Sequence, residues 1–137
     1  MQTAYTDIAG RSNPDYTEVG AGEIGSLTLS PGLYKWGTGV SISTDVTLSG
    51  DASAIWIFQI GQGLTMAPGA KVILSGGAQA QNVVWQCAGG CTINTTAVIQ
   101  GIVLSKTAIT LNTGATAIGR LFAQTQVSLV KSTVTQP

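Results

Sequence analysis

Hydrophobic and polar residues alternate in short runs along most of the chain, and Gly, Pro, Asn and Ser separate the runs. The runs are rich in Val, Ile, Thr and aromatic residues, span three to six residues and lack helical periodicity. This pattern predicts short β-strands at residues 33–36, 40–42, 46–48, 55–60, 72–74, 82–87, 99–104, 109–111, 119–123 and 127–129.

The first 26 residues do not follow this pattern. Residues 2–11 predict one or two helical turns, which Gly10, Asn13 and Pro14 would end. Residues 12–26 predict irregular structure. A chain of 137 residues favours a single domain over residues 1–137, in which residues 1–26 form a helix and linker and residues 27–137 form the strands.

The predicted strands repeat along the chain. A shift of 18 residues aligns Asn94 with Asn112 and Gly101 with Gly119, and a shift of 27 aligns Phe58-Gln59 with Trp85-Gln86. Repeats of this length with several short strands are typical of a β-solenoid, in which parallel strands stack about 4.7–4.9 Å apart. The sequence therefore predicts an all-β, parallel β-helix of about five coils.

Five segments share one register under these shifts. Side chains alternate along a strand, so one set should point into the core and the other toward solvent. The inward positions are Val40/Ile42, Leu64/Met66, Cys91/Ile93, Ile109/Leu111 and Val127/Leu129. The outward positions form a small-residue column of Gly39, Gly63, Gly90, Ala108 and Gln126 and a hydroxyl column of Ser41, Thr65, Thr92, Thr110 and Ser128.

The outward columns carry no charge in any of the five coils. Thr is a good strand residue and Gly can relieve crowding, which would explain one coil without any binding role. Solvated strand faces normally carry charges that oppose association, so five uncharged coils favour a binding surface. A flat, regular and neutral ligand would suit it, such as ordered water, a polysaccharide crystal or the sheet of another protein.

Composition excludes several other classes of protein. Charged residues make up 9% of the chain, the net charge is zero and there is no His. A basic footprint for nucleic acid is missing, and catalysis or metal binding through His is impossible. The six acidic residues lie within the first 51 positions, and the few basic residues beyond them suggest solubilising charges.

Targeting signals are also missing from the sequence. There is no apolar stretch long enough for a transmembrane helix, so we expect no membrane partner. The segment after Met1 has neither the basic start nor the apolar middle of a signal peptide.

Cys87 and Cys91 are four residues apart and fall at core positions of the register. They could be two buried thiols or a disulfide across the corner between them. A metal site is disfavoured because two further ligands are missing.

The remaining candidate sites have simpler explanations. Asp45 and Asp51 are typical turn residues, and nothing pairs Asp45, Asp51 or Glu23 as the acid and base of a hydrolase. The glycines of residues 20–25 precede no Lys, so this segment is not a phosphate loop. The three Trp residues could form a sugar-stacking platform, but their apolar surroundings favour the core. We therefore expect no enzyme and no cofactor.

Several long blocks of the sequence resemble the ice-binding (antifreeze) protein family. They are PGLYKWGTGVSISTDVTLSG (31–50), IWIFQI (55–60), ILSGGAQAQNVVWQ (73–86), GIVLSKTAITLNTGAT (101–116) and GRLFAQTQVSLVKSTVTQ (119–136). Residues 1–18 resemble the end of that family's long helix. The resemblance implies a discontinuous right-handed β-helix with a helix alongside, and a secreted protein that binds ice and produces thermal hysteresis and inhibition of ice recrystallisation.

A short motif of that family, Thr-Ala/Gly-x-Thr/Asn, assigns residues to the ice-binding face. Residues 107–110 match it fully, and residues 38–41 match with Ser in the last place. Residues 113–116 also match the letters but fall at a corner of the predicted register. The other three coils match the motif in part. The register and the resemblance together predict an ice-binding site made of Thr38, Gly39, Ser41, Gly63, Thr65, Gly90, Thr92, Thr107, Ala108, Thr110, Thr125, Gln126 and Ser128.

The sequence departs from the family at its start, since about as much again precedes the helix in that family, including a coil that stacks on the last one. We therefore expect a fragment, a naturally short form, or end-to-end self-association through the uncapped last coil. The alternative function is an extracellular adhesive or polysaccharide-binding module. A remnant of a polysaccharide-active solenoid is disfavoured because paired acids are missing.

Overall fold

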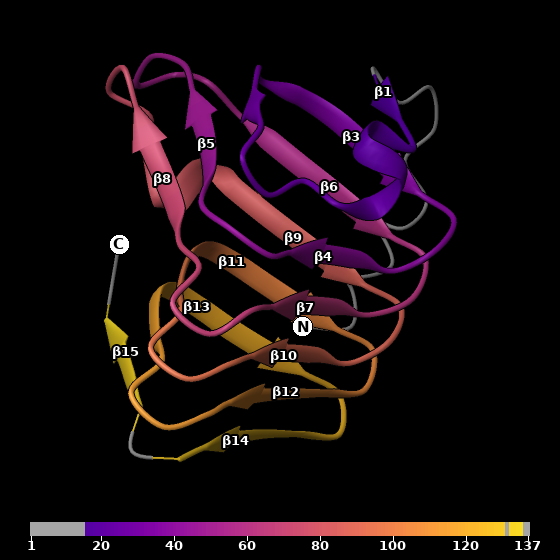
Figure 1. Cartoon of the computed structure of the whole chain (residues 1–137), viewed down its shortest axis with the longest axis vertical. Coiled ribbons are helices and arrows are strands. Elements are labelled where there is room, and N and C mark those ends of the chain that lie inside the picture. The colour runs from indigo at the N-terminus through magenta and orange to yellow at the C-terminus, as the bar shows by residue number, and fades with distance from the viewer. Residues whose placement is uncertain (1–15, 131, 136–137) are drawn as a thin grey trace.

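The computed structural model describes residues 16–130 and 132–135 of the chain. Parallel strands form three sheets; the earlier coils contribute one strand to each sheet in turn, whereas the later coils contribute strands to sheets A and B only (Figure 1). Sheet A contains β1 (Tyr16–Thr17), β3 (Gly32–Trp36), β6 (Trp56–Ile60), β9 (Val83–Cys87), β11 (Val98–Ser105), β13 (Thr116–Ala123) and β15 (Thr133–Thr135). Sheet B contains β4 (Val40–Ile42), β7 (Leu64–Met66), β10 (Cys91–Ile93), β12 (Ala108–Leu111) and β14 (Gln126–Leu129), and sheet C contains β2 (Thr28–Leu29), β5 (Val46–Ser49) and β8 (Val72–Ser75).

The chain is therefore a right-handed parallel β-helix, as the sequence predicted. The ten predicted strands all form, and β7 and β10 form where the repeat register placed them. The structure adds β15, which pairs with the start of β13.

Residues 16–26 are more regular than expected. Tyr16–Thr17 pair with Tyr34–Lys35, and Val19–Gly22 form a 3-10 turn, η1. Glu23 then bridges to Ser41 beside sheet B. The prediction of irregular structure was therefore wrong for this part, because its backbone already stacks on the next coil. The helical turns predicted for residues 2–11 lie outside the described residues.

Sheet C ends at β8, and the later coils replace it with longer strands. The eight-residue strands β11 and β13 pair along their whole length and bend where Gly101 lies beside Gly119. Both glycines have positive φ, 127° and 149°. A Cβ on Gly119 would lie 1.9 Å from the carbonyl oxygen of Gly101, so only glycine fits this bend. A second 3-10 turn, η2 (Ala80–Asn82), leads into β9.

A row of aromatic rings follows the strands of sheet A, from the exposed Tyr16 to the buried Trp85. Tyr16, Tyr34, Phe58 and Trp85 occupy matching positions of successive coils, with centroid separations of 4.5, 5.2 and 4.2 Å. All three Trp side chains are buried, and each indole N–H donates to a backbone carbonyl: Trp36 to Val19, Trp56 to Leu29 and Trp85 to Gln100. The Trp residues therefore serve the core and do not form a sugar-stacking platform.

The last coil buries its inward side chains less than the others. Ile109 and Leu111 are 0% exposed, whereas the corresponding Val127 and Leu129 of β14 are 39% and 50% exposed. β14 lies at the end of sheet B, and β15 lies at the end of sheet A. Among the described residues, no strand pairs with the outer edge of β14 or of β15.

Candidate functional site

The outward side of sheet B holds the candidate site (Figure 1). Its five strands pair in the predicted register, with Ser41, Thr65, Thr92, Thr110 and Ser128 in one row. Val40, Leu64, Cys91 and Ile109 point inward and are at most 1% exposed. We call the outward side the sheet B face: the small-residue column (Gly39, Gly63, Gly90, Ala108, Gln126) and the hydroxyl column (Ser41, Thr65, Thr92, Thr110, Ser128).

The hydroxyl column faces solvent. Ser41 and Thr65 are exposed, and Thr92, Thr110 and Ser128 are half-buried between their neighbours in the stack. Each residue presents one hydroxyl, and the three Thr residues also present a methyl group. Gln126 bridges the two columns in the last coil, where its amide donates to the Ser128 hydroxyl at 3.0 Å.

The small-residue column is small for a steric reason. A Cβ on Gly63 would lie 2.6 Å from the carbonyl oxygen of Gly90, and a Cβ on Gly39 would lie 3.1 Å from that of Gly63. At Gly90 the nearest atom would be 3.3 Å away, and the next residue in the column is Ala108. The close approach of neighbouring coils is therefore enough to explain why residue 63 is glycine. The same close approach disfavours larger side chains at the glycines of this column, so this half of the face is flat.

The remaining candidate residues lie in the turns that connect sheet A to sheet B. Thr38, Thr107 and Thr125 are exposed just before β4, β12 and β14. The N–H of Thr125 donates to the Thr107 carbonyl at 2.9 Å, which aligns the last two corners.

Ser105 is a positioning residue that the sequence reasoning missed. It is buried, its hydroxyl lies 3.0 Å from the Gly89 carbonyl and 3.2 Å from the Ala108 carbonyl, and it accepts the Thr107 N–H at 3.1 Å. It therefore fixes the corner before β12. Ser105 pairs with Cys87, at a register position that is otherwise apolar. A hydroxyl residue at an apolar position is the sequence feature that could have indicated this role.

Asparagines line the opposite edge of sheet B. The Asn112 amide donates to the Asn94 side-chain oxygen at 3.0 Å, and the Asn94 amide donates to the Met66 carbonyl at 2.7 Å. Thr113 and Gly114 lie in the following turn, which confirms that the motif at residues 113–116 falls at a corner and not on the sheet B face.

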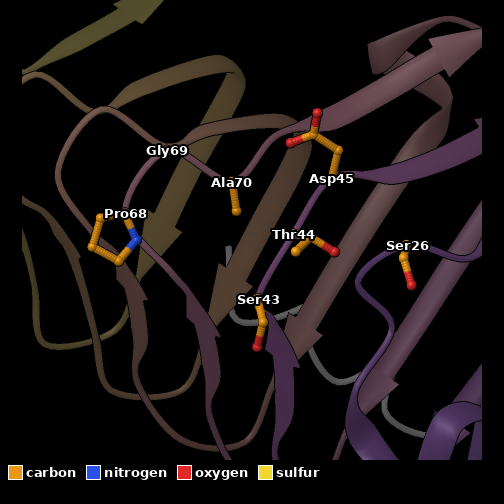
Figure 2. Close-up of a pocket in the computed structure, with 7 residues that line it drawn as sticks. All are labelled: Ser26, Ser43, Thr44, Asp45, Pro68, Gly69 and Ala70. Carbon is orange, nitrogen blue, oxygen red and sulfur yellow. The ribbon is translucent and has the colours of Figure 1, made fainter.

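An open depression of about 490 Å³ lies beyond this edge, where β4 and β7 lead toward sheet C (Figure 2). It is lined by Ser26, Ser43, Thr44, Asp45, Pro68, Gly69 and Ala70. Asp51 accepts the Ser53 N–H at 2.9 Å and acts as a turn residue, as predicted, whereas Asp45 accepts the Lys71 N–H of the next coil at 3.0 Å and links the two coils.

Glu23 ties the first coil to the second near this depression. Its carboxylate accepts the N–H groups of Gly25 at 2.8 Å and Ser43 at 3.1 Å, and also the Ser43 hydroxyl. Partial burial would raise the pKa of Glu23, but these hydrogen bonds outweigh it and hold the pKa below its ordinary value. This carboxylate is therefore a structural anchor of the turn.

Cys87 and Cys91 lie in the core at the predicted positions, and both are buried free thiols. The Cys91 thiol donates to Cys87 Sγ at 2.8 Å. Among the described residues, no group of three or more Cys, Asp or Glu could hold a metal ion. Within the same residues, no helix is long and apolar enough to cross a membrane.

Comparison with known proteins identifies relatives over the whole chain. The profile of the ice-binding-like family matches residues 1–135. An ice-binding protein of Colwellia sp. is 53% identical over 137 residues, which is 100% of this chain and 54% of that protein. An ice-binding protein of Leucosporidium sp. (strain AY30) is 44% identical over 136 residues, which is 99% of this chain and 52% of that protein.

Solved structures match equally well. The structure of an ice-binding protein from an Arctic yeast, described for its antifreeze activity, superposes with a TM-score of 0.97 at 45% identity and covers 99% of this chain and 59% of that one. A domain of ice-binding protein 1 from Shewanella frigidimarina superposes with a TM-score of 0.90 at 40% identity, over 97% of this chain and 58% of that one. The chain thus spans about half the length of the curated relatives it matches.

Proposed function

The chain belongs to the ice-binding-like family, and we propose that it binds ice through the sheet B face. One observation carries the proposal: five parallel strands in register present two columns without a single charged side chain. The two columns extend roughly 19 Å across the strands at the usual strand spacing. A neutral plane with a regular repeat suits a neutral ligand with a regular repeat.

Adsorption follows from many weak contacts over a rigid plane. Thr methyl groups can occupy gaps of a water lattice while the hydroxyls join its hydrogen-bond network. Each contact contributes little, but the stacked strands fix all of them in one plane, so little conformational entropy is lost on binding. Bound molecules then stop growth of the ice front between them, which produces thermal hysteresis and slows recrystallisation.

This function requires adsorption and no chemistry. The polar groups that could serve catalysis have structural partners: Asp51 and Glu23 accept backbone N–H groups of their own turns, and Asp45 accepts a backbone N–H of the next coil. We therefore assign no enzymatic activity to the chain. Because ice grows outside cells in the surroundings of cold-adapted organisms, we propose a secreted protein.

The uncapped last coil supports a second proposal, end-to-end self-association. Val127, Leu129, Val130 and Val134 are each 39–50% exposed at this end. The outer edges of β14 and β15 also offer backbone groups for pairing. Sedimentation at several concentrations tests this, with Leu129→Lys as the disrupting variant. A monomer of the wild-type chain at every concentration would contradict it.

Growth of a single ice crystal in a solution of the chain tests ice binding. We expect the crystal to develop facets, because adsorption blocks particular planes. A crystal that stays round while the protein is folded, together with retention of the chain on an insoluble glycan, would favour the adhesive or polysaccharide-binding alternative instead. The relatives described above are named as ice-binding proteins, which favours the first function over this alternative.

A further inference from the structure

The two cysteines lie where the chain passes from sheet A to sheet B. Cys87 ends β9 and Cys91 begins β10, so only residues 88–90 separate them. Cys87 lies between Ile60 and Ser105 of the neighbouring coils, and Cys91 lies between Leu64 and Ile109. Both thiols therefore meet inside the core, directly beneath the middle strand of the sheet B face.

The backbone of this corner is held from both sides. The N–H groups of Ala88 and Gly89 donate to the backbone carbonyls of Ile60 and Gln62 in the preceding coil, at 2.9 and 2.7 Å respectively. The Lys106 N–H of the following coil donates to the backbone carbonyl of Cys87 at 3.0 Å. A bond between sulfur atoms is about 2.05 Å long, so Sγ atoms already 2.8 Å apart need to move by less than 1 Å to bond.

We propose that Cys87 and Cys91 are a modification site, at which a small-molecule or protein disulfide oxidises them to an intramolecular disulfide that staples the corner into β10. One cysteine thiolate attacks a sulfur of the oxidant, forms a mixed disulfide and releases one thiolate, which takes up a proton and becomes a thiol. The second cysteine then attacks the mixed disulfide and releases the second thiol. The two cysteines lose two electrons and two protons, and the oxidant is reduced to two thiols.

The timing of the reaction follows from burial. Cys87 and Cys91 are 0% and 1% exposed, so an oxidant cannot reach them in the folded chain. The close Cys91 thiol and burial also raise the pKa of the Cys87 thiol, which keeps Cys87 in its unreactive protonated form. The bond therefore forms while the chain folds, and once formed it resists reductants unless the corner opens.

The disulfide would stabilise a corner that has few side-chain contacts of its own. Gly89 and Gly90 have no side chains that could pack against neighbours, and Gly90 belongs to the small-residue column of the sheet B face. A covalent link across residues 88–90 holds β10, and with it Thr92, in line with the strands on either side. The inference does not depend on the ligand of the sheet B face.

Oxidative refolding tests the proposal. The denatured chain is refolded with oxidised glutathione or with a reductant, and the double variant Cys87→Ala/Cys91→Ala is treated in the same way. In the oxidised wild-type chain we expect a mass lower by two hydrogen atoms, no thiol titratable after denaturation, and a monomer on a non-reducing gel. We expect a melting temperature roughly 6 °C above that of the reduced chain, from the entropy of closing a short loop.

The Cys87→Ala/Cys91→Ala variant separates the effect of the disulfide from other effects of the redox conditions. It should show no redox-dependent change in melting temperature, because it has no thiols. Two titratable thiols in the wild-type chain after oxidative refolding, disulfides only between molecules, or an oxidised form that melts no higher than the reduced one would each overturn the proposal. The mass and thiol measurements use the wild-type chain, so they decide the question even if the variant folds poorly.

Discussion

Replacing Thr92 by Tyr should remove most of the ice-binding activity. Thr92 lies in β10, the middle strand of sheet B, and its neighbours in the hydroxyl column are Thr65 and Thr110. These neighbours are about 4.8 Å away in the adjacent strands, so a phenol ring at Thr92 stands above both of them. The ring then holds the whole face away from an ice surface.

The size of the effect follows from the short range of dispersion forces. A gap of about 0.5–1 Å already forfeits a quarter to a half of the attraction between two atoms. A ring that projects by more than one carbon–carbon bond opens a larger gap over the flanking residues, so more than half of the contacts are lost. We expect thermal hysteresis to fall by more than half at equal concentration, as measured by nanolitre osmometry.

A matched control is available on another face. Thr47 lies in β5 and is half-buried in sheet C like Thr92 in sheet B, with Thr28 and Ile73 as its neighbours in the stack. Thr47→Tyr therefore makes the same chemical change away from the sheet B face and should keep the wild-type hysteresis, as should Lys71→Ala. Both Tyr variants should melt within a few degrees of the wild-type chain, since surface substitutions usually change stability by about 0.5 kcal/mol or less. Wild-type hysteresis in both Thr92→Tyr and Thr110→Tyr would refute the assignment of the face.

Three further predictions concern stability. Ser105→Ala leaves the Thr107 N–H and two carbonyl groups without the buried Ser105 hydroxyl and should cost about 1–3 kcal/mol in urea unfolding. Ser49→Ala, at an exposed position, should change stability little, and equal effects of the two substitutions would contradict the positioning role. Gly63→Ala should destabilise by about 1–3 kcal/mol, because its Cβ meets a carbonyl oxygen at 2.6 Å, and Gly90→Ala should cost less, because its Cβ would lie 3.3 Å from the nearest carbonyl oxygen. Because folding lowers the pKa of Glu23 below 4.5, the stability that this group contributes is present above that pH and is lost as the pH falls through the folded value. Glu23→Gln should therefore melt with a weaker dependence on pH in acid, and an unchanged pH profile would show that the carboxylate is not the anchor.

The strands of the β-helix could be predicted from the sequence because its coils repeat. Inward residues such as Ile42, Met66, Ile93 and Leu111 recur at one register position, and pairing the coils buries all of them. A slip by one residue would expose this entire set, so the alternation decides which side chains of sheet B point inward, and the spacing of the repeats aligns the strands. The same alternation placed the two columns of the candidate site on one face.

Other features of the fold could not be predicted from the repeats, because they depend on contacts between particular residues of different coils. β1 and the bridge at Glu23 form because the backbone of the first coil finds partners in the second, although its residues lack the strand pattern. Ser105 occupies an apolar register position, and its role depends on carbonyl groups of two different coils. The reason for Gly63 is likewise visible only once a carbonyl of the next coil is placed beside it.

Partition into ice tests the central claim most directly. A single ice crystal is grown slowly in an equimolar mixture of the wild-type chain and Thr92→Tyr, and mass spectrometry measures the ratio of the two proteins in the melted ice and in the remaining liquid. If the sheet B face binds ice, the wild-type chain is enriched in the ice and the variant remains in the liquid. Equal partition of the two folded proteins would contradict the account.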